Sequence, residues 1–266
     1  MTATIPTPAC QSQRLAVTAH FDAAHDDWNR YYDAADRSGI IFRSRLDLAL
    51  RLCRRHVLRA GHALDLGCGA GPAAIALAAT GHQVIGIDIS PSMIATADRL
   101  AAERDLSDRC RFLSADFFEL GLAPRTFDLI VALGFIEYFD DPSAVLERIR
   151  NLLASTGIAV VQITNRVAMK HLLRGTIGRR IEHTWSGLDA RQFGPGEFAR
   201  IARGAGLRRI DYRGHGFGPL KIGGRFIPGY RAAGWIERRM DQLAGHRIAR
   251  GLGRFGASIV NVLAPG

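Results

Sequence analysis

The sequence predicts an α/β fold built on a doubly wound, mostly parallel sheet of seven strands. Three observations favour this fold. Short apolar runs alternate with amphipathic stretches between residues 62 and 164. A turn with three glycines follows the first run, and a proline stands where each following helix is expected to begin, at Pro72, Pro91 and Pro142. Because alternating strand and helix units are joined by right-handed crossovers, we expect parallel strands with helices on both faces of the sheet.

The N-terminal part of the chain precedes this alternation. Residues 1–16 are polar and contain prolines, and we expect them to be disordered. Aromatic residues follow at Phe21 and Trp28, on a short predicted helix that either closes over the site as a lid or docks against the sheet. The apolar positions between Phe42 and Cys53 have helical spacing, which predicts a helix leading into the first strand.

The later elements are bounded by capping residues and glycines. Ser90 and Asp141 each precede a proline, so each pair supplies an N-cap and a first helical residue. Gly81 and Gly157 are expected to end the helices before them, and one further helix is predicted over residues 195–205. The predicted strands are residues 62–67, 83–88, 110–115, 127–133, 157–164, 207–213 and 257–263.

The chemistry is concentrated in the glycine turn, Asp65-Leu66-Gly67-Cys68-Gly69-Ala70-Gly71, which leads into a helix. Glycines without side chains let a ligand lie against the backbone at a helix N-terminus, where N–H groups and the helix dipole point outward. Asp88 ends the second predicted strand, where a carboxylate can bind the two hydroxyl groups of a ribose. The stretch therefore predicts a site for a nucleoside cofactor.

Two cofactor classes fit the turn differently. The dinucleotide pattern G-x-G-x-x-G/A can be placed on Gly69, Gly71 and Ala74. The pattern acid-x-G-x-G-x-G instead fits the turn from Asp65 onward without adjustment. Together with Asp88 and the later Ser-Ala-Asp-Phe stretch, this second pattern resembles the class I S-adenosylmethionine-dependent methyltransferases, over about residues 60 to 165.

The resemblance implies S-adenosylmethionine as cofactor and a Rossmann-like methyltransferase fold with an antiparallel edge strand and cap insertions. The three glycines would let the aminoacyl arm pass, and Asp65 would support that end. Asp88 would bind the ribose, and Asp116 would accept a hydrogen bond from the adenine amino group. No metal site is expected. The full set of implied cofactor-binding residues is Asp65, Gly67, Gly69, Gly71, Asp88, Ile89, Met93, Ala115, Asp116, Phe117 and Leu133.

We expect one methyltransferase domain over residues 17–266, preceded by the N-terminal segment 1–16. Within this domain, residues 17–58 would form the N-terminal helices or lid. Residues 59–165 would form the cofactor-binding core, and residues 166–266 would form the cap and the last strands.

Residues 133–142, after the fourth predicted strand, bear on the acceptor. They lack the Asn/Asp-Pro-Pro-aromatic tetrad of enzymes that methylate nucleobase amino groups. Glu137-Tyr138 stands where small-molecule members of the family carry a His-His or Glu-His pair. His183 lies in a His-x-Trp stretch that loosely resembles quinone-type O-methyltransferases. Because an imidazole titrates near neutral pH, we interpret His183 as the base, with Tyr138 as the fallback and a surface histidine as the alternative.

The charge of the chain is uneven. It has 35 basic and 25 acidic residues, a net charge of +10. The stretch from Arg166 to the C-terminus holds nineteen basic and six acidic residues, a net charge of +13. Beside apolar residues such as Phe226 and Trp235, this charge favours peripheral contact with an anionic membrane, and codon bias toward arginine is the alternative. The arginines do not follow any recognisable RNA-binding module, so nucleic acid is not the expected partner.

These features predict a methyltransferase that acts on a small, lipophilic acceptor at oxygen. Residues 1–15 contain no apolar segment, no apolar run is long enough to cross a bilayer, and the four cysteines form no CxxC pair. We therefore expect a cytoplasmic protein, with contact limited to the inner face of a membrane.

Two alternatives to this function stay open: an RNA methyltransferase that uses the basic C-terminal half, and a non-catalytic cofactor-binding protein. The sequence indicates no oligomeric state.

Overall fold

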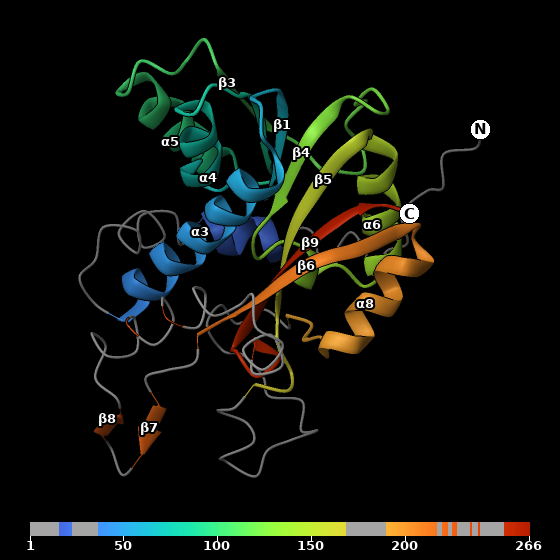
Figure 1. Ribbon diagram of the computed structural model, residues 1–266. Coiled ribbons are helices and arrows are strands. Elements are labelled where there is room, and N and C mark those ends of the chain that lie inside the picture. Colours follow the sequence, from blue (N-terminus) through green and yellow to red (C-terminus); the bar gives the residue numbers. More distant parts are fainter. Residues whose placement is uncertain are drawn as a thin grey trace.

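The computed structural model describes residues 16–22, 37–168, 190–216, 220–222, 225–227, 235, 239 and 253–266. Within these residues, seven strands form one sheet (Figure 1). The α/β fold class with a mostly parallel sheet is confirmed. In order across the sheet, the strands are β3 (Cys110–Ser114), β2 (Gln83–Asp88), β1 (His62–Leu66), β4 (Phe127–Ala132), β5 (Leu153–Thr164), β9 (Ser258–Pro265) and β6 (Leu207–His215).

The strand order creates a crevice in the middle of the sheet. β1 pairs in parallel with β2 and with β4, so that Leu66 lies beside Ile87 on one side and Ala132 on the other. The chain moves outward from β1 through β2 and β3, then returns to continue through β4 and β5. The topological switch point therefore lies between β1 and β4, where ligands of such sheets bind. The antiparallel strand β9 lies one position in from the edge, between β5 and β6.

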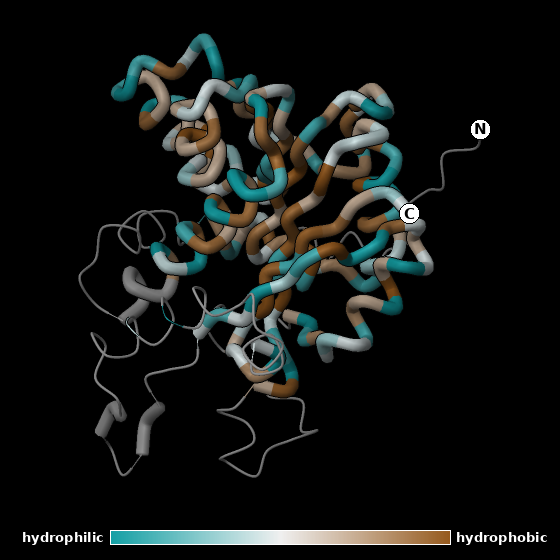
Figure 2. The backbone as a smooth tube through the Cα atoms, in the orientation of Figure 1, coloured by the Kyte–Doolittle hydropathy of each residue, from teal (hydrophilic) through white to brown (hydrophobic). Residues whose placement is uncertain are grey.

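Helices cover both faces of the sheet. α3 (Arg37–His56), α4 (Pro72–Ala78) and α5 (Pro91–Ala102) lie on one face, and α6 (Pro142–Leu152) and α8 (Pro195–Gly204) lie on the other (Figure 1). Successive strand residues face opposite layers, as the pleat of a strand requires. Ala63 and Leu129 belong to the first apolar cluster, whereas Leu64 and Ile130 belong to the second. Figure 2 shows the hydrophobic residues concentrated along the strands, between the helices.

The predicted helix caps are confirmed. The Ser90 hydroxyl oxygen accepts a hydrogen bond from the Met93 backbone N–H at 3.2 Å. Asp141 accepts bonds from the N–H groups of Ser143 and Ala144 at 2.9 and 3.3 Å. Each cap satisfies helix N–H groups that have no partner inside the helix.

Two features of the sheet differ from the sequence prediction. β5 begins at Leu153, directly after α6, and not at Gly157. Gly157 lies at a register shift beside β4, where an added Cβ would stand 2.6 Å from the Phe127 carbonyl oxygen. A two-stranded hairpin of β7 (Leu220–Ile222) and β8 (Arg225–Ile227) was not predicted, and it forms a separate sheet (Figure 1).

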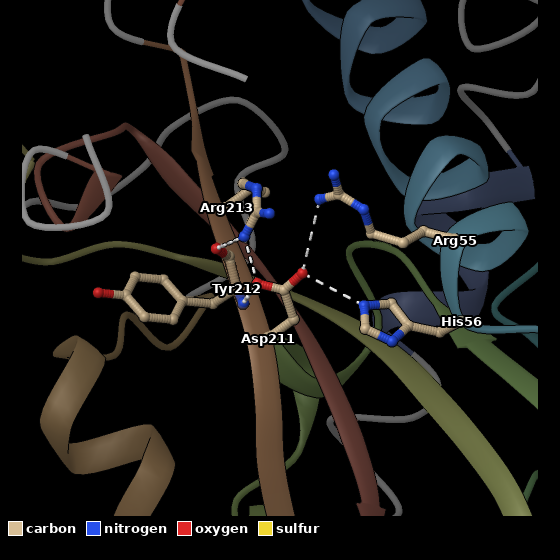
Figure 3. A network of polar contacts seen from close by, with 5 residues as sticks. All are labelled: Arg55, His56, Asp211, Tyr212 and Arg213. Atoms are coloured by element: carbon tan, nitrogen blue, oxygen red, sulfur yellow. Dashed lines mark hydrogen bonds and ion pairs between the residues drawn. The ribbon is translucent and has the colours of Figure 1, made fainter. Parts of the chain in front are cut away.

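An ionic network joins the end of α3 to the edge strand β6 (Figure 3). Asp211 accepts from the His56 Nε2 at 3.2 Å and lies 4.0 Å from the Arg55 Nη1. On its own strand Asp211 also pairs with Arg213, whose Nη1 donates to the Tyr212 carbonyl oxygen at 2.8 Å. The network holds the C-terminal end of α3 against the edge strand β6.

Several sequence predictions fall on other parts of the chain. The N-terminal segment up to residue 15, for which the sequence predicts disorder, lies outside the described residues, as do Trp28 and His183. In the part of the chain that the structure describes, no helix is both long enough and apolar enough to span a membrane.

Candidate cofactor and acceptor site

The predicted site residues meet at the carboxyl ends of four neighbouring strands. The strands β3, β2, β1 and β4 are adjacent in that order. One of these residues ends or follows each strand: Asp116 after β3, Asp88 at the end of β2, Gly67 after β1 and Leu133 after β4. Gly67 and Leu133 therefore flank the switch point. The arrangement brings the acidic and glycine positions into one row, as the sequence predicts.

The glycine turn needs glycine at each of its three positions. Gly67, Gly69 and Gly71 have φ values of +66°, +53° and +80°, a region that other residues rarely adopt. An added Cβ would lie 2.8 Å from the Phe135 ring at Gly67 and 2.9 Å from the Phe112 ring at Gly71. At Gly69, by contrast, an added Cβ would meet no atom of the described residues within 4 Å. Gly69 is thus the position where the backbone is open to a ligand.

Asp88 holds this turn in place. Its Oδ2 accepts from the Gly69 N–H at 2.8 Å, and its Oδ1 accepts from the Ser90 N–H at 3.0 Å. Burial raises the pKa of Asp88, and these two N–H groups lower it in part. Each carboxylate oxygen can accept a further hydrogen bond, which suits the two hydroxyl groups of a ribose.

Asp65 lies deeper, under the first turn of α4. It is buried, and its Oδ2 accepts from the Ala74 backbone N–H at 3.1 Å. Burial raises the pKa of Asp65 to about 7, and the Asp88 charge acts in the same direction. The Ala74 N–H and the positive charge of Arg45 oppose this shift. In this structure the side chain joins β1 to the helix that begins after the glycine turn.

The ends of β2 and β3 supply the adjoining wall. Ile89 and Ala115 are half-buried, and Met93 is buried in α5. The Asp116 Oδ1 accepts from the Phe118 N–H at 2.7 Å, which stabilises the turn after β3. Phe117 is only 3% exposed, and its ring packs edge-to-face against Phe118 and Phe135.

The segment beyond β4, residues 133–142, is rich in aromatic rings, and we call it the acceptor side because the sequence predicts that the acceptor binds there. Tyr138 belongs to the short 3₁₀ helix η1 (Ile136–Tyr138), and its ring stands edge-to-face with Phe21 at 5.7 Å between centroids. Phe135 and Phe139 lie 4.8 Å apart on the same segment. Burial raises the pKa of Tyr138 well above its ordinary value, and the nearby Glu137 charge adds to the shift.

The N-terminal helical residues 16–22 reach the cofactor side as well. The Asp22 Oδ1 accepts from the Ser90 hydroxyl and, at 2.7 Å, from the Ser92 hydroxyl at the start of α5. Phe21 contacts Tyr138 from the same helical segment. The segment therefore bridges the ends of β2 and β4, across the row of site residues.

Sequence reasoning missed several buried polar residues on the acceptor side. Arg45, Gln162 and Glu137 form a hydrogen-bonded chain, and His215 bonds to the Ser44 hydroxyl at 2.6 Å. Burial lowers the pKa of His215 to about 3. These residues come from α3, β5, η1 and β6, and no local motif marks them; only Glu137 lies in a stretch that the sequence singled out.

The residues present fit S-adenosylmethionine. Gly69 leaves the backbone open, Asp88 has accepting capacity for a ribose, and Asp65 and Asp88 place negative charge beside the turn. A cationic cofactor relieves the repulsion between these carboxylates. Within the described residues, no group of three or more His, Cys, Asp or Glu side chains is placed to hold a metal ion.

Comparisons with known proteins show which family the chain resembles. Residues 59–186 match the family model described as a methyltransferase domain. The chain is 30% identical to a ubiquinone biosynthesis O-methyltransferase of Paraburkholderia phymatum over 161 residues, which is 59% of this chain and 68% of that protein. It is 28% identical to the corresponding protein of Methylococcus capsulatus over 178 residues, 65% of this chain and 74% of the relative.

A solved structure has the same fold. Magnesium protoporphyrin IX methyltransferase from Synechocystis PCC 6803, crystallised with bound S-adenosylhomocysteine, matches with a TM-score of 0.63 and 18% identity. The match covers 94% of this chain and 99% of that one. The fold is that of a Rossmann-like methyltransferase. The chain belongs to the class I S-adenosylmethionine-dependent methyltransferases.

Proposed function

We propose that this methyltransferase transfers the methyl group to an oxygen atom of a small, lipophilic, aromatic acceptor. The observation that carries the proposal is the aromatic acceptor side beyond β4, where Phe21 packs on Tyr138 and Phe135 lies against Phe139. Flat apolar rings suit these aromatic surfaces. The similarity to O-methyltransferases of ubiquinone biosynthesis supports the same acceptor class.

The placement of each residue supports its proposed role in cofactor binding. Gly69 gives the aminoacyl arm its close approach, Asp65 supports that end, and Asp88 binds the ribose. Asp116 accepts from the adenine amino group beside Ala115. Further contacts around the adenine and the methyl group come from Ile89, Met93, Phe117 and Leu133.

When bound, the cofactor supplies an activated methyl group, so the protein has to align the acceptor, exclude water and remove one proton. Tyr138 keeps its own proton at neutral pH because its pKa is raised, which suits it to orient the acceptor by donating a hydrogen bond. His183 stays a candidate base. If it has this role, His183→Ala lowers turnover at least about tenfold, with cofactor affinity unchanged.

Methyl acceptance by cell fractions tests the proposal. The purified protein is incubated with S-adenosylmethionine labelled in the methyl group and with either a lipid extract or an RNA fraction. We expect label in the lipid extract, and mass spectrometry is expected to locate it on oxygen. Label in RNA would favour the RNA methyltransferase. Cofactor binding without label in any fraction would favour the non-catalytic alternative.

We also propose peripheral contact with an anionic membrane, through the basic and apolar region that contains Trp235. This side chain is 56% exposed, and the Arg239 guanidinium carbon lies 5.5 Å from the centre of its ring. Tryptophan and arginine together suit the headgroup boundary of a bilayer. Salt-sensitive sedimentation with anionic but not neutral vesicles is expected, and it should weaken in Trp235→Ala. Equal sedimentation with both vesicle types would exclude this contact.

A further inference from the structure

A chain of buried polar groups crosses the acceptor side of the site. The Arg45 Nη1 on α3 donates to the Gln162 Oε1 on β5 at 3.3 Å. The Gln162 Nε2 in turn donates to the Glu137 Oε1 on η1 at 3.3 Å, and the Thr164 backbone N–H donates to the same oxygen. Glu137 is 5% exposed and Gln162 is 3% exposed. Residues of α3 and β5 thus position the buried carboxylate of Glu137 on η1.

These groups converge on Gly134, directly after Leu133 at the end of β4. A Cβ added to Gly134 would lie 3.2 Å from the Arg45 Nη1 and 3.8 Å from both the Gln162 Oε1 and the Glu137 Oε2. Gly134 has a φ of +70°. The Glu137 Oε2 therefore faces the backbone at the edge of the switch point, while Oε1 takes the bonds from β5.

We propose that Glu137 is the general base of the methyl transfer, with Arg45 and Gln162 as positioning residues that hold its carboxylate. The inference rests on the proposed O-methyl transfer. The acceptor hydroxyl gives its proton to the Glu137 Oε2, and the oxygen forms the new bond to the methyl carbon. The carbon–sulfur bond breaks, and its electron pair stays on sulfur. The proton later leaves Glu137 for solvent, so atoms and charge balance.

The charged and titratable neighbours of Glu137 favour it over Tyr138 as the base. Burial raises the pKa of Glu137 above its ordinary value, which makes its carboxylate a stronger base, while its bonds to Thr164 and Gln162 and the positive charge of Arg45 limit that rise. Tyr138 stays protonated because burial and the Glu137 charge raise its pKa. His215, which lies near Arg45, is neutral at working pH because its pKa is lowered to about 3.

A purely structural role for Glu137 makes different predictions. Its backbone carbonyl already accepts from the Arg191 N–H at 2.8 Å, and its side chain joins η1 to β5. If Glu137 only anchored η1, its loss would lower stability and affect all acceptors equally. If it is the base, its loss matters only for acceptors that still carry the proton.

The test compares Glu137→Gln with wild type on two probe acceptors, catechol and 4-nitrocatechol. The nitro group makes the second phenol acidic enough to be ionised at mildly alkaline pH. We expect Glu137→Gln to slow turnover of catechol at least about 100-fold and to leave turnover of 4-nitrocatechol within a few-fold of wild type. Binding of S-adenosylhomocysteine should be unchanged. Glu147→Gln, an exposed glutamate on α6, is the matched control and should change neither acceptor.

Two further measurements keep the inference falsifiable if Glu137→Gln does not fold or neither probe is accepted. Infrared difference spectra of the free wild-type protein, isotope-labelled in its glutamate side chains to separate them from Asp65 and Asp88, should show a glutamate carboxyl group that titrates above the ordinary range. In Arg45→Met this titration should move to higher pH, because the positive charge that favours the carboxylate is gone.

Three results would overturn the inference. The first is an equal loss of turnover on both probe acceptors in Glu137→Gln. The second is the absence of a glutamate that titrates above its ordinary range. The third is loss of the acid limb of the pH–rate profile in His183→Ala, with that limb unchanged in Glu137→Gln. If the wild-type protein binds the cofactor but methylates neither a probe nor a cell fraction, the proposed function is wrong, whatever the infrared titration shows.

Discussion

The carboxylate of Asp88 accepts a hydrogen bond from the Gly69 backbone N–H at 2.8 Å. The acid that ends β2 and the open glycine of the turn after β1 are therefore one structural unit. A change at Asp88 removes an acceptor for the cofactor and loosens the turn at the same time.

Asp88→Asn should weaken binding of S-adenosylhomocysteine. An amide can accept through one atom only, so one of the N–H groups of Gly69 and Ser90 would face an NH₂ group. Hydrogen bonds to a charged group are worth about 1.5–3 kcal/mol each, which predicts at least a tenfold loss of affinity by calorimetry. Asp98→Asn, on the exposed side of α5, is the control and should bind as wild type does. Equal affinity in both variants would contradict this role.

Gly69→Ala and Gly71→Ala form a matched pair. Both glycines have positive φ, but only Gly71 faces the Phe112 ring, 2.9 Å from an added Cβ. Gly71→Ala should lower the free energy of unfolding by about 2–5 kcal/mol through strain and overpacking. Gly69→Ala should cost only about 1–2 kcal/mol of backbone strain yet lose cofactor binding, because its methyl group occupies the open face. Denaturant unfolding and calorimetry measure the two effects. Retained binding in Gly69→Ala would show that the cofactor does not approach there.

The raised pKa of Asp65 predicts that the free energy of unfolding depends on pH. Its pKa rises from 3.8 to about 7 on folding, so the folded protein binds the extra proton between these values. Stability from this group is therefore present at low pH and is lost as pH rises from about 4 to about 7, by up to about 4 kcal/mol. Asp65→Asn keeps an acceptor for the Ala74 N–H and does not titrate. Relative to wild type, the variant should gain stability as the pH rises from about 4 to about 7 in urea unfolding. A constant difference would show that Asp65 stays ionised.

The hydrogen bonds of Asp22 are expected to hold the N-terminal helical segment against the start of α5. Asp22→Ala removes the acceptor for the Ser90 and Ser92 hydroxyls, so residues 16–22 should exchange their amide hydrogens faster. Ser92→Ala removes one of these two bonds and should have a smaller effect. Hydrogen exchange read by mass spectrometry compares the three proteins. Unchanged exchange in Asp22→Ala would mean that other contacts, such as that of Phe21 with Tyr138, hold the segment.

Local signals explain which features the sequence could predict. Ser90 and Asp141 cap helices through bonds to residues two or three positions away, and the glycine turn is a contiguous pattern, so both are visible in the chain itself. The fold class follows from these signals and the alternation of apolar runs. The start of β5 at Leu153 depends on Gly157 meeting a neighbouring strand, which no local pattern marks.

The acceptor side was harder to predict for the same reason. Arg45, Glu137 and Gln162 come together only because α3 packs against β5 and η1 lies beside the same strand. Arg45 occupies an ordinary position on an amphipathic helix, and Gln162 stands among the apolar residues of the second half of β5. Their sequence separations leave no spacing rule that would join them.

The cofactor preference of the glycine turn tests the central claim most directly. Calorimetry with the purified protein compares S-adenosylmethionine, S-adenosylhomocysteine and NAD under the same conditions. We expect both sulfur cofactors to bind at least about tenfold more tightly than NAD. Tighter binding of NAD would contradict the account, because the turn and Asp88 would then serve a dinucleotide.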